Sequence, residues 1–388
     1  MKKCVLYGMI LLSQVIMAQT TIPISITSAY LDTVRKVEIT LPESYDTSQV
    51  NYPVIYCLDG DYTQFMVNGL IQFNAYLGKS PECIVVSIPQ NYLNEKKQKF
   101  QRWIDCGYSW KTGMLKESGM QFKDFIQKEL IPEIEKNFRV APYKAIIGHS
   151  FTANYVNYFL LDERPFFNAY VAISPYYASN MYDSLQTKLD QLKEPVYYFT
   201  AYGENDLSGH KSSVQEFDKR FGKLEIPHFH YELFDLNGNK ATHYTIFTKA
   251  LPFGFEHIFP GYGEMTDQEV KEVLHTADKV AYLRHRIAES NRRYGTHKTI
   301  TESDVWNVGY AIEKKKQWSQ FKELGEWFIQ ENPEQVTGYY ALAGYYEKTK
   351  DFQMALKYYQ KGYSFLGEDI LNKADFQEDI YRMQKKLK

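Results

Sequence analysis

The sequence predicts an α/β domain with a mostly parallel central sheet, followed by a smaller region made only of helices. Between about residue 53 and residue 259, short and wholly apolar runs alternate with stretches of helical spacing. Strands that are buried on both faces have this composition, and helices between them imply parallel crossover connections. From Met265 to the C-terminus the apolar runs disappear and only helical spacing remains, which predicts a second, all-helical unit.

Length and composition are those of a folded protein with more than one domain. The chain has 388 residues, and an average domain has about 150. Hydrophobic residues make up 44% and charged residues 24% of the chain, which argues against disorder. The formal net charge is only −2, so the chain lacks the excess of lysine and arginine that phosphate binding needs. We therefore expect no nucleic-acid partner.

The first residues have the pattern of an export signal. Lys2 and Lys3 precede an apolar stretch over residues 5–17, which ends at the small residue Ala18. A positive start, a short apolar run and a small residue at the cut are the parts of a secretory signal peptide. We predict a signal peptide at residues 1–18 and a secreted or periplasmic protein, with an uncleaved anchor as the alternative. No later segment approaches the ~18 apolar residues of a membrane span, so none is expected after cleavage.

The cysteine and histidine patterns argue against a disulfide framework and against a metal site. Cys57, Cys83 and Cys106 follow the predicted signal, and an odd number cannot all pair. Buried free thiols are the favoured interpretation, with one bridge involving Cys106 as the alternative. His228 and His230 would share one face of a strand, but no third ligand is close in sequence. We expect neither a metal nor a cofactor.

The predicted elements of the α/β domain follow in order along the chain. Val37, Ile39 and Leu41 alternate with polar residues, which predicts a half-exposed strand that ends at Pro42. Buried strands are expected at residues 54–58, 84–88, 145–147, 170–173 and 196–200, and a further strand is expected at residues 229–234. The clearest helix covers residues 122–138, where apolar residues recur at every third or fourth position among charges.

The C-terminal region resembles a tetratricopeptide repeat. Residues 336–369 fit the ~34-residue template, with small residues at Ala343 and Ala355 where two helices would approach. The preceding window fits less well. The expected role of this region is a cap on the first domain, a homodimer contact or a groove for a protein partner. The chain should therefore divide into a signal peptide (1–18), an α/β domain (19–260), a connecting helical segment (261–300) and a tetratricopeptide-like domain (301–388).

The stretch from residue 145 to residue 154 is the most informative about chemistry. An apolar strand runs into Gly148-His149-Ser150 and then directly into helical spacing. A strand, a sharp turn and a helix with a serine at the apex form a nucleophile elbow, which holds the serine in a strained conformation that tolerates only small neighbours. The helix beyond Ser150 would direct its positive end toward developing negative charge, and the backbone N–H of Phe151 would be one oxyanion donor.

An acid and a histidine follow the serine in a fixed order. A turn with Glu204 and Asp206 follows one later strand, and a loop that ends in His243 follows the next. Serine, acid, histidine is the chain order of an α/β-hydrolase triad. Ser150 would attack, His243 would take and return its proton, and Asp206 would orient the imidazole. Glu204 is the alternative acid.

Five separated blocks, in the right order, resemble the family of putative esterases. They lie at residues 53–61, 129–134, 148–150, 172–175 and 243–247, within a likeness that spans about residues 34–255. The family groups esterase D, siderophore esterases of the enterobactin type, feruloyl esterases and mycolyl transferases. The resemblance implies an α/β-hydrolase fold and a serine esterase that forms an acyl-enzyme on a small-molecule ester, such as a siderophore or feruloyl ester. It also implies the backbone N–H of Asp61 as the second oxyanion donor.

Two alternatives to hydrolysis stay open at this point. An acyltransferase would use the same triad, and a non-catalytic scaffold would bind partners through the helical tail. The sequence also departs from the family at the elbow, because Thr152-Ala153 stands where the family usually has two glycines. Two candidate pocket residues, Arg102 and Trp103, lie in the long irregular region 90–119 that such folds place over the serine. The other two are His149, next to the serine, and Tyr176, at the carboxyl end of a predicted strand.

Overall fold

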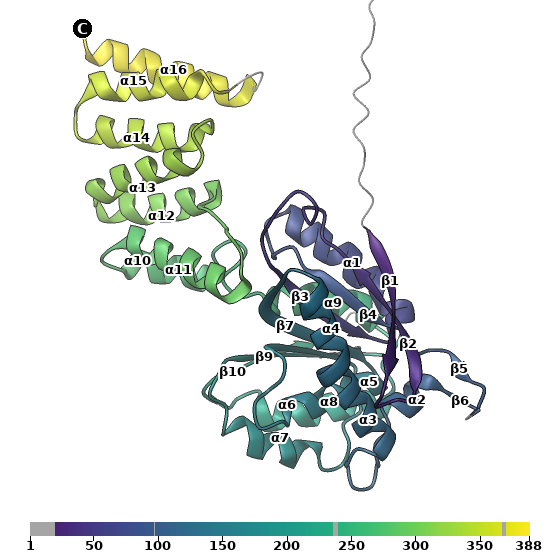
Figure 1. Cartoon of the computed structure of the whole chain (residues 1–388). Coiled ribbons are helices and arrows are strands. Elements are labelled where there is room, and N and C mark those ends of the chain that lie inside the picture. The colour runs from purple at the N-terminus through teal and green to yellow at the C-terminus, as the bar shows by residue number, and fades with distance from the viewer. Residues whose placement is uncertain (1–19, 97, 236–239, 367–369) are drawn as a thin grey trace, which may run out of the picture.

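The computed structural model describes residues 20–96, 98–235, 240–366 and 370–388. These residues form a domain built around one large sheet, from which a stack of helices extends toward the C-terminus (Figure 1). The predicted signal peptide at residues 1–18 lies outside the described residues, as do residues 236–239 of the loop that precedes His243.

The central sheet has eight strands in the order β1-β2-β4-β3-β7-β8-β9-β10. From β4 to β10 the neighbouring strands are parallel, and β1 and β2 form an antiparallel edge. This confirms the predicted fold class. The strands are β1 (Thr21–Ser28), β2 (Thr33–Thr40), β3 (Tyr52–Leu58), β4 (Ile84–Ile88), β7 (Val140–His149), β8 (Ala169–Ile173), β9 (Val196–Tyr202) and β10 (Phe229–Asp235).

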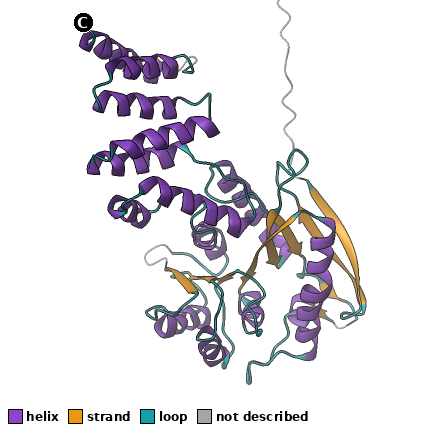
Figure 2. Cartoon of the chain, turned by 60° about the vertical axis from the view of Figure 1, so that its left-hand side comes forward, coloured by secondary structure: helices purple, strands orange, loops and turns teal. Residues whose placement is uncertain are grey.

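Burial explains which strands the sequence revealed. Every residue of β3, β4, β8 and β9 is buried, because helices cover both faces of the sheet (Figure 2). Edge strand β1 was not predicted. Its isoleucines Ile22, Ile24 and Ile26 are half-buried and alternate with exposed residues, so its signal is a two-residue period rather than an apolar run.

Two groups of helices cover the sheet. One face packs against α1 (Gly60–Tyr76), α9 (Ile246–Ile258) and the end of α11 (Lys279–Tyr294). The other face packs against α3 (Glu117–Phe125), η1 (Ile126–Leu130), α4 (Ile131–Asn137), α5 (Phe151–Tyr155), α6 (Asn157–Leu160), α7 (Met181–Leu189) and α8 (Ser208–Phe221). The helix predicted over residues 122–138 is thus a run of three segments, of which η1 is one π-helical turn.

The region over residues 90–119 is more ordered than expected. It contains a small hairpin, β5 (Leu93–Asn94) and β6 (Lys99–Phe100), followed by α2 (Gln101–Asp105). The guanidinium of Arg35 on β2 makes two hydrogen bonds of 2.8 Å to the Asp105 carboxylate, and both side chains are almost fully buried. This ion pair fastens the region to the sheet, and the 70-residue separation of its partners hides it from pattern analysis.

The C-terminal helices stack in chain order away from the sheet (Figure 1). They are α10 (Asp267–His275), α11, α12 (Glu302–Lys315), α13 (Trp318–Glu331), α14 (Val336–Lys348), α15 (Phe352–Tyr363) and α16 (Ile370–Lys386). Tyr294 at the end of α11 is fully buried against Tyr143 and Phe259 of the sheet domain, which fixes the stack to that domain. Within the described ranges, no helix combines the length and the apolar character needed to cross a bilayer.

Candidate active site

Ser150 occupies the apex of a sharp turn between β7 and α5. Its backbone has φ of 61° and ψ of −117°, a conformation that costs free energy and is found mainly at functional sites. The turn also needs a glycine before it, because a Cβ atom on Gly148 would lie 2.5 Å from the carbonyl oxygen of Thr152. The local structure is therefore that of a nucleophile elbow.

Three side chains from three loops form a continuous chain of hydrogen bonds. His243 Nε2 lies 2.9 Å from Ser150 Oγ, and His243 Nδ1 lies 2.8 Å from Asp206 Oδ1. A carboxylate can only accept, so the imidazole carries its proton on Nδ1 and Nε2 accepts the proton of the Ser150 hydroxyl. This is the arrangement of a nucleophile beside a general base.

The two candidate acids have different surroundings. The Asp206 side chain is fully buried, while Glu204 is exposed and receives a 3.4 Å hydrogen bond from the backbone N–H of Lys240. Burial alone would raise the pKa of Asp206, but hydrogen bonds from His243 and Ser174 outweigh it and hold that pKa below its ordinary value. Asp206 therefore keeps its negative charge at neutral pH, in contact with the imidazole.

The backbone that carries the two expected oxyanion donors is firmly held. Phe151 and Asp61 lie in the first turns of α5 and α1, where backbone N–H groups have no acceptor within the helix. The Asp61 carboxylate accepts hydrogen bonds from the backbone N–H groups of Gln90 (2.6 Å) and Asn91 (2.8 Å). A Cβ atom on Gly60 would lie 2.7 Å from the backbone of the end of β4, so this turn needs glycine.

Thr152, at the position where the family usually has glycine, links the elbow to the start of α1. Its hydroxyl accepts from the backbone N–H of His149 at 2.9 Å and lies 2.8 Å from an Asp59 carboxylate oxygen, to which it donates. Asp59 is fully buried and forms a 2.7 Å ion pair with Arg102. Burial raises the pKa of Asp59, although Arg102 and Thr152 oppose the shift. The threonine is thus accommodated by polar contacts.

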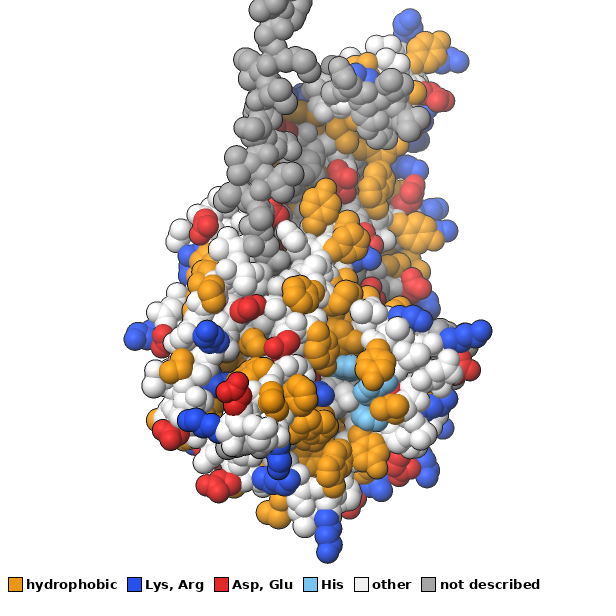
Figure 3. Space-filling view, turned by 90° about the vertical axis from the view of Figure 1, so that its right-hand side faces the viewer, with side chains coloured by type: hydrophobic (Ala, Val, Ile, Leu, Met, Phe, Trp, Pro, Cys, Tyr) orange, Lys and Arg blue, Asp and Glu red, His pale blue; other side chains and the backbone are white. Residues whose placement is uncertain are grey.

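Ser150 opens into a cavity of about 380 Å³. In Figure 3, histidine side chains lie at the bottom of a hollow whose rim is largely apolar. The cavity is lined by Tyr62, Met66, Arg102, His149, Ser150, His243, Tyr244, Phe247 and Thr248. Arg102 and His149, two of the candidate pocket residues, are therefore beside the serine.

The other two candidates lie further along the same face. Trp103 lines an adjoining hollow with Tyr108, Trp110 and Phe151, and its ring lies 4.3 Å from that of Phe151. Tyr176 instead packs against Trp110, with ring centroids 5.1 Å apart. An aromatic surface thus extends from the residue after the serine toward solvent.

Two functional contacts were not foreseen from the sequence. Ser174 Oγ lies 2.7 Å from Asp206 Oδ2 and 3.0 Å from His243 Nδ1. His149 Nε2 lies 3.0 Å from the carbonyl oxygen of His243, and its Nδ1 lies 2.9 Å from the hydroxyl of Tyr62. Burial lowers the pKa of His149 to about 3, so this ring is neutral. The available signal was position, because Ser174 directly follows β8 at the edge where the triad residues lie.

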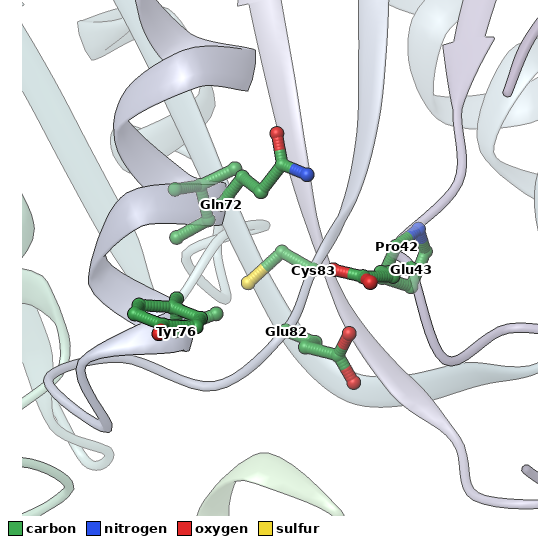
Figure 4. Close-up of a pocket in the computed structure, with 8 residues that line it drawn as sticks. Pro42, Glu43, Gln72, Tyr76, Glu82 and Cys83 are labelled. Carbon is green, nitrogen blue, oxygen red and sulfur yellow. The ribbon is translucent and has the colours of Figure 1, made fainter. Parts of the chain in front are cut away.

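Other candidate sites are weaker. A hollow of about 110 Å³ lies at the far end of α1, where Tyr76 and Gln72 face Cys83 and Glu82 (Figure 4). Its lining residues include no serine–histidine pair. In the described part of the chain, no group of three or more potential metal ligands could hold an ion. Cys57, Cys83 and Cys106 are buried free thiols, which confirms the favoured interpretation.

Comparison with known proteins assigns a family. The model of the family described as Putative esterase matches residues 28–223, half of the chain. The chain belongs to this esterase family. The match includes Ser150 and Asp206 and ends before His243. No curated protein matches the chain in a sequence search.

Several solved structures share the fold. An uncharacterised protein from Capnocytophaga ochracea superposes with a TM-score of 0.69 at 21% identity, covering 94% of this chain and 100% of that one. An IroE-like serine hydrolase from Shewanella oneidensis gives 0.58 at 21% identity, covering 78% of this chain and 96% of that one. The BES protein from Bacillus cereus gives 0.52 at 18% identity, covering 66% and 99%. The first of these matches extends over the C-terminal helices as well as the sheet domain.

Proposed function

We propose that this protein is an exported serine esterase that hydrolyses carboxylic esters through an acyl-enzyme on Ser150. Membership of the esterase family supports ester hydrolysis. The observation that carries the serine mechanism is the unbroken hydrogen-bond chain from Asp206 through His243 to Ser150, with a strained backbone at the nucleophile. Export is supported by the pattern of residues 1–18.

The proposed reaction has two halves. Ser150 Oγ attacks the ester carbonyl carbon while its proton passes to His243 Nε2, and the backbone N–H groups of Phe151 and Asp61 receive the negative charge that forms on the carbonyl oxygen. The alcohol leaves with the proton held by His243. Water then attacks the acyl-Ser150 ester and gives its proton to His243, which passes that proton to Ser150 Oγ as the acyl–oxygen bond breaks and the acid is released. Asp206 stabilises the charged imidazole in both halves.

The surroundings of Ser150 support an ester with an acyl or aryl group as the substrate. The cavity at the serine has apolar walls from Met66 and Phe247, and the adjoining hollow has aromatic walls from Trp103 and Trp110. An ester carries an acyl group and an alcohol group, and two consecutive residues of the elbow, Ser150 and Phe151, each line one of the two hollows. We therefore propose a siderophore, feruloyl or related acyl ester as the substrate class.

We also propose that residues 19–260 form the complete catalytic domain and residues 301–388 a tetratricopeptide-like domain, joined by residues 261–300. Two features support this division. All the residues proposed for the site lie between Asp59 and Thr248, and the helices from α10 onward contain two apolar clusters of their own.

A panel of aryl, acyl, feruloyl and siderophore esters tests the proposed activity. Wild-type protein should hydrolyse at least one class, and Ser150→Ala should reduce its kcat by more than about a thousandfold while the protein stays folded, since the triad acts as a unit. Retained turnover in Ser150→Ala would contradict the serine mechanism. Repeating the assay with an added alcohol measures transfer against hydrolysis. An N-terminus at Gln19 on protein recovered outside the cytoplasm would bear out export, and a retained Met1 would contradict it.

A further inference from the structure

The order of the strands places Ser174 between the nucleophile loop and the acid loop. It directly follows β8, which pairs with β7 on one side and with β9 on the other. The strand pairing continues past the strand ends, because the backbone N–H of Ser150 donates to Ile173 (2.9 Å) and that of Ser174 donates to Ala201 (2.8 Å). The backbone of Ser174 is therefore fixed relative to both loops.

The neighbours of the Ser174 hydroxyl fix which hydrogen bond it donates and which it accepts. The Asp206 carboxylate accepts but cannot donate, so Ser174 gives its proton to Asp206 Oδ2 at 2.7 Å. His243 Nδ1 gives its proton mainly to Asp206 Oδ1 at 2.8 Å. Because its proton points to Asp206, Ser174 Oγ acts as an acceptor toward His243. The Nδ1–H of His243 therefore makes a bifurcated hydrogen bond, with Ser174 Oγ as the second acceptor at 3.0 Å. The three side chains form a closed ring of hydrogen bonds.

We propose that Ser174 is a positioning residue, which closes a hydrogen-bond ring with Asp206 and His243 and so holds the imidazole aligned on Ser150. This inference rests on the proposed function at Ser150. Without the Ser174 hydroxyl, Asp206 Oδ2 keeps only the longer hydrogen bond from the backbone N–H of Gly203 at 3.4 Å, and the carboxylate is held less firmly against the imidazole. Hydrogen bonds to charged groups are the stronger ones, so the loss affects the charged transition state more than the resting protein.

The backbone of Ser174 supports a functional role for its side chain. Ser174 is fully buried and has φ of 52°, in the left-handed region that glycine adopts without strain and other residues rarely enter. Because a serine holds this conformation, the strain must be maintained by its surroundings. Glycine at this position would relieve the backbone strain and remove the hydroxyl. Ser174→Gly should therefore keep or raise the stability of the fold while it lowers the activity.

His210 of α8 holds Ser174 from the other side. Its Nδ1 donates to the carbonyl oxygen of Ser174 at 2.7 Å, since a carbonyl can only accept. The His210 ring also lies 4.5 Å from the His243 ring. Burial lowers the pKa of His210, so no second positive charge opposes the imidazolium that forms during the reaction.

The test compares Ser174→Ala and Ser174→Gly with the wild type, using p-nitrophenyl acetate. We expect kcat to fall about ten- to a hundredfold in both variants, the effect of losing a hydrogen bond to a charged group, with KM changed by less than about twofold. Ser174→Gly should melt at the wild-type temperature or above it. The matched control is Ser28→Ala, which removes another buried hydroxyl that donates to a carboxylate, that of Glu129, at the end of edge strand β1. It should lower the melting temperature and leave kcat unchanged.

A double variant shows whether Ser174 acts through the histidine. In a His243→Ala background, adding Ser174→Ala should change the residual rate by less than about twofold, because no imidazole is left to position. An equal loss in both backgrounds, or wild-type kcat in Ser174→Ala, would overturn the inference. The proposed function is judged separately by Ser150→Ala. If that variant keeps the wild-type rate, the function and the role of Ser174 are both wrong; if it is inactive and Ser174→Ala is not, only the role of Ser174 is wrong.

Discussion

Replacing Asp206 with asparagine probes the part of the account that depends most on proton placement. Four groups donate to the carboxylate. His243 Nδ1 and the N–H of Leu207 donate to Oδ1 at 2.8 Å each, and the hydroxyl of Ser174 and the N–H of Gly203 donate to Oδ2 at 2.7 Å and 3.4 Å. An amide has one accepting oxygen and one donating nitrogen, so in Asp206→Asn a donor must face a donor on one side.

The size of the effect follows from the tautomer of His243. With the amide nitrogen toward Nδ1, the imidazole proton moves to Nε2 and the base that faces Ser150 is lost. An equivalent change in other serine hydrolases lowers kcat about 10⁴-fold, or about 5.5 kcal/mol of transition-state stabilisation. We therefore expect Asp206→Asn to reduce kcat on p-nitrophenyl acetate by about 10³- to 10⁴-fold.

Glu204→Gln is the matched control, two residues away. Glu204 is exposed and accepts a hydrogen bond from the backbone N–H of Lys240 at 3.4 Å. The kcat of Glu204→Gln should therefore stay within about twofold of the wild type. Melting curves of both variants check that they fold. A kcat of Asp206→Asn within tenfold of the wild type would show that Asp206 does not orient the imidazole, and a loss in Glu204→Gln as large as that in Asp206→Asn would show the same.

Three further changes test the supports of the site. Thr152→Val should lower the free energy of unfolding by about 1–3 kcal/mol, because it leaves the buried Asp59 carboxylate short of a donor; urea unfolding measures this. Arg35→Met should cost about 3–5 kcal/mol in the same assay, because Asp105 would stay buried without its cation. The pKa of Asp206 in the folded protein is lowered. The ionised carboxylate therefore stabilises the fold fully above about pH 4, and this stabilisation is lost as pH falls through the folded-state pKa. The free energies of unfolding of wild type and Asp206→Asn should converge in acid.

Each of these three predictions has an outcome that would contradict it. Unchanged urea midpoints would show that the Thr152 hydroxyl is dispensable. Arg292→Met removes the cation of an exposed pair with Glu289 and should cost less than about 1 kcal/mol; a loss as large as that of Arg35→Met would contradict the burial argument. A gap between wild type and Asp206→Asn that widens toward acid would contradict the sign of the pKa shift.

The sequence predicted the structural features that depend on residues close together in the chain. The buried strands β3, β4, β8 and β9 produce apolar runs that cannot be mistaken for loops, and the strained elbow needs Gly148 one residue before its histidine neighbour. The apex serine could therefore be located from a few consecutive residues.

The remainder depends on contacts between residues far apart in the chain. The ion pair of Arg35 and Asp105 spans 70 residues, and the contact of Ser174 with His243 spans 69. No local pattern marks either pair. The choice between Glu204 and Asp206 was open for the same reason, because only the folded chain shows which carboxylate the imidazole meets.

The site of covalent labelling by a fluorophosphonate tests the central claim most directly. Labelled protein would be digested and the modified peptide identified by mass spectrometry, while ester turnover is followed in parallel. We predict one label per chain, on Ser150, with activity lost in proportion and with labelling slowed strongly in His243→Ala. Full ester turnover after Ser150 is labelled, or a label at another serine that abolishes turnover, would contradict this prediction.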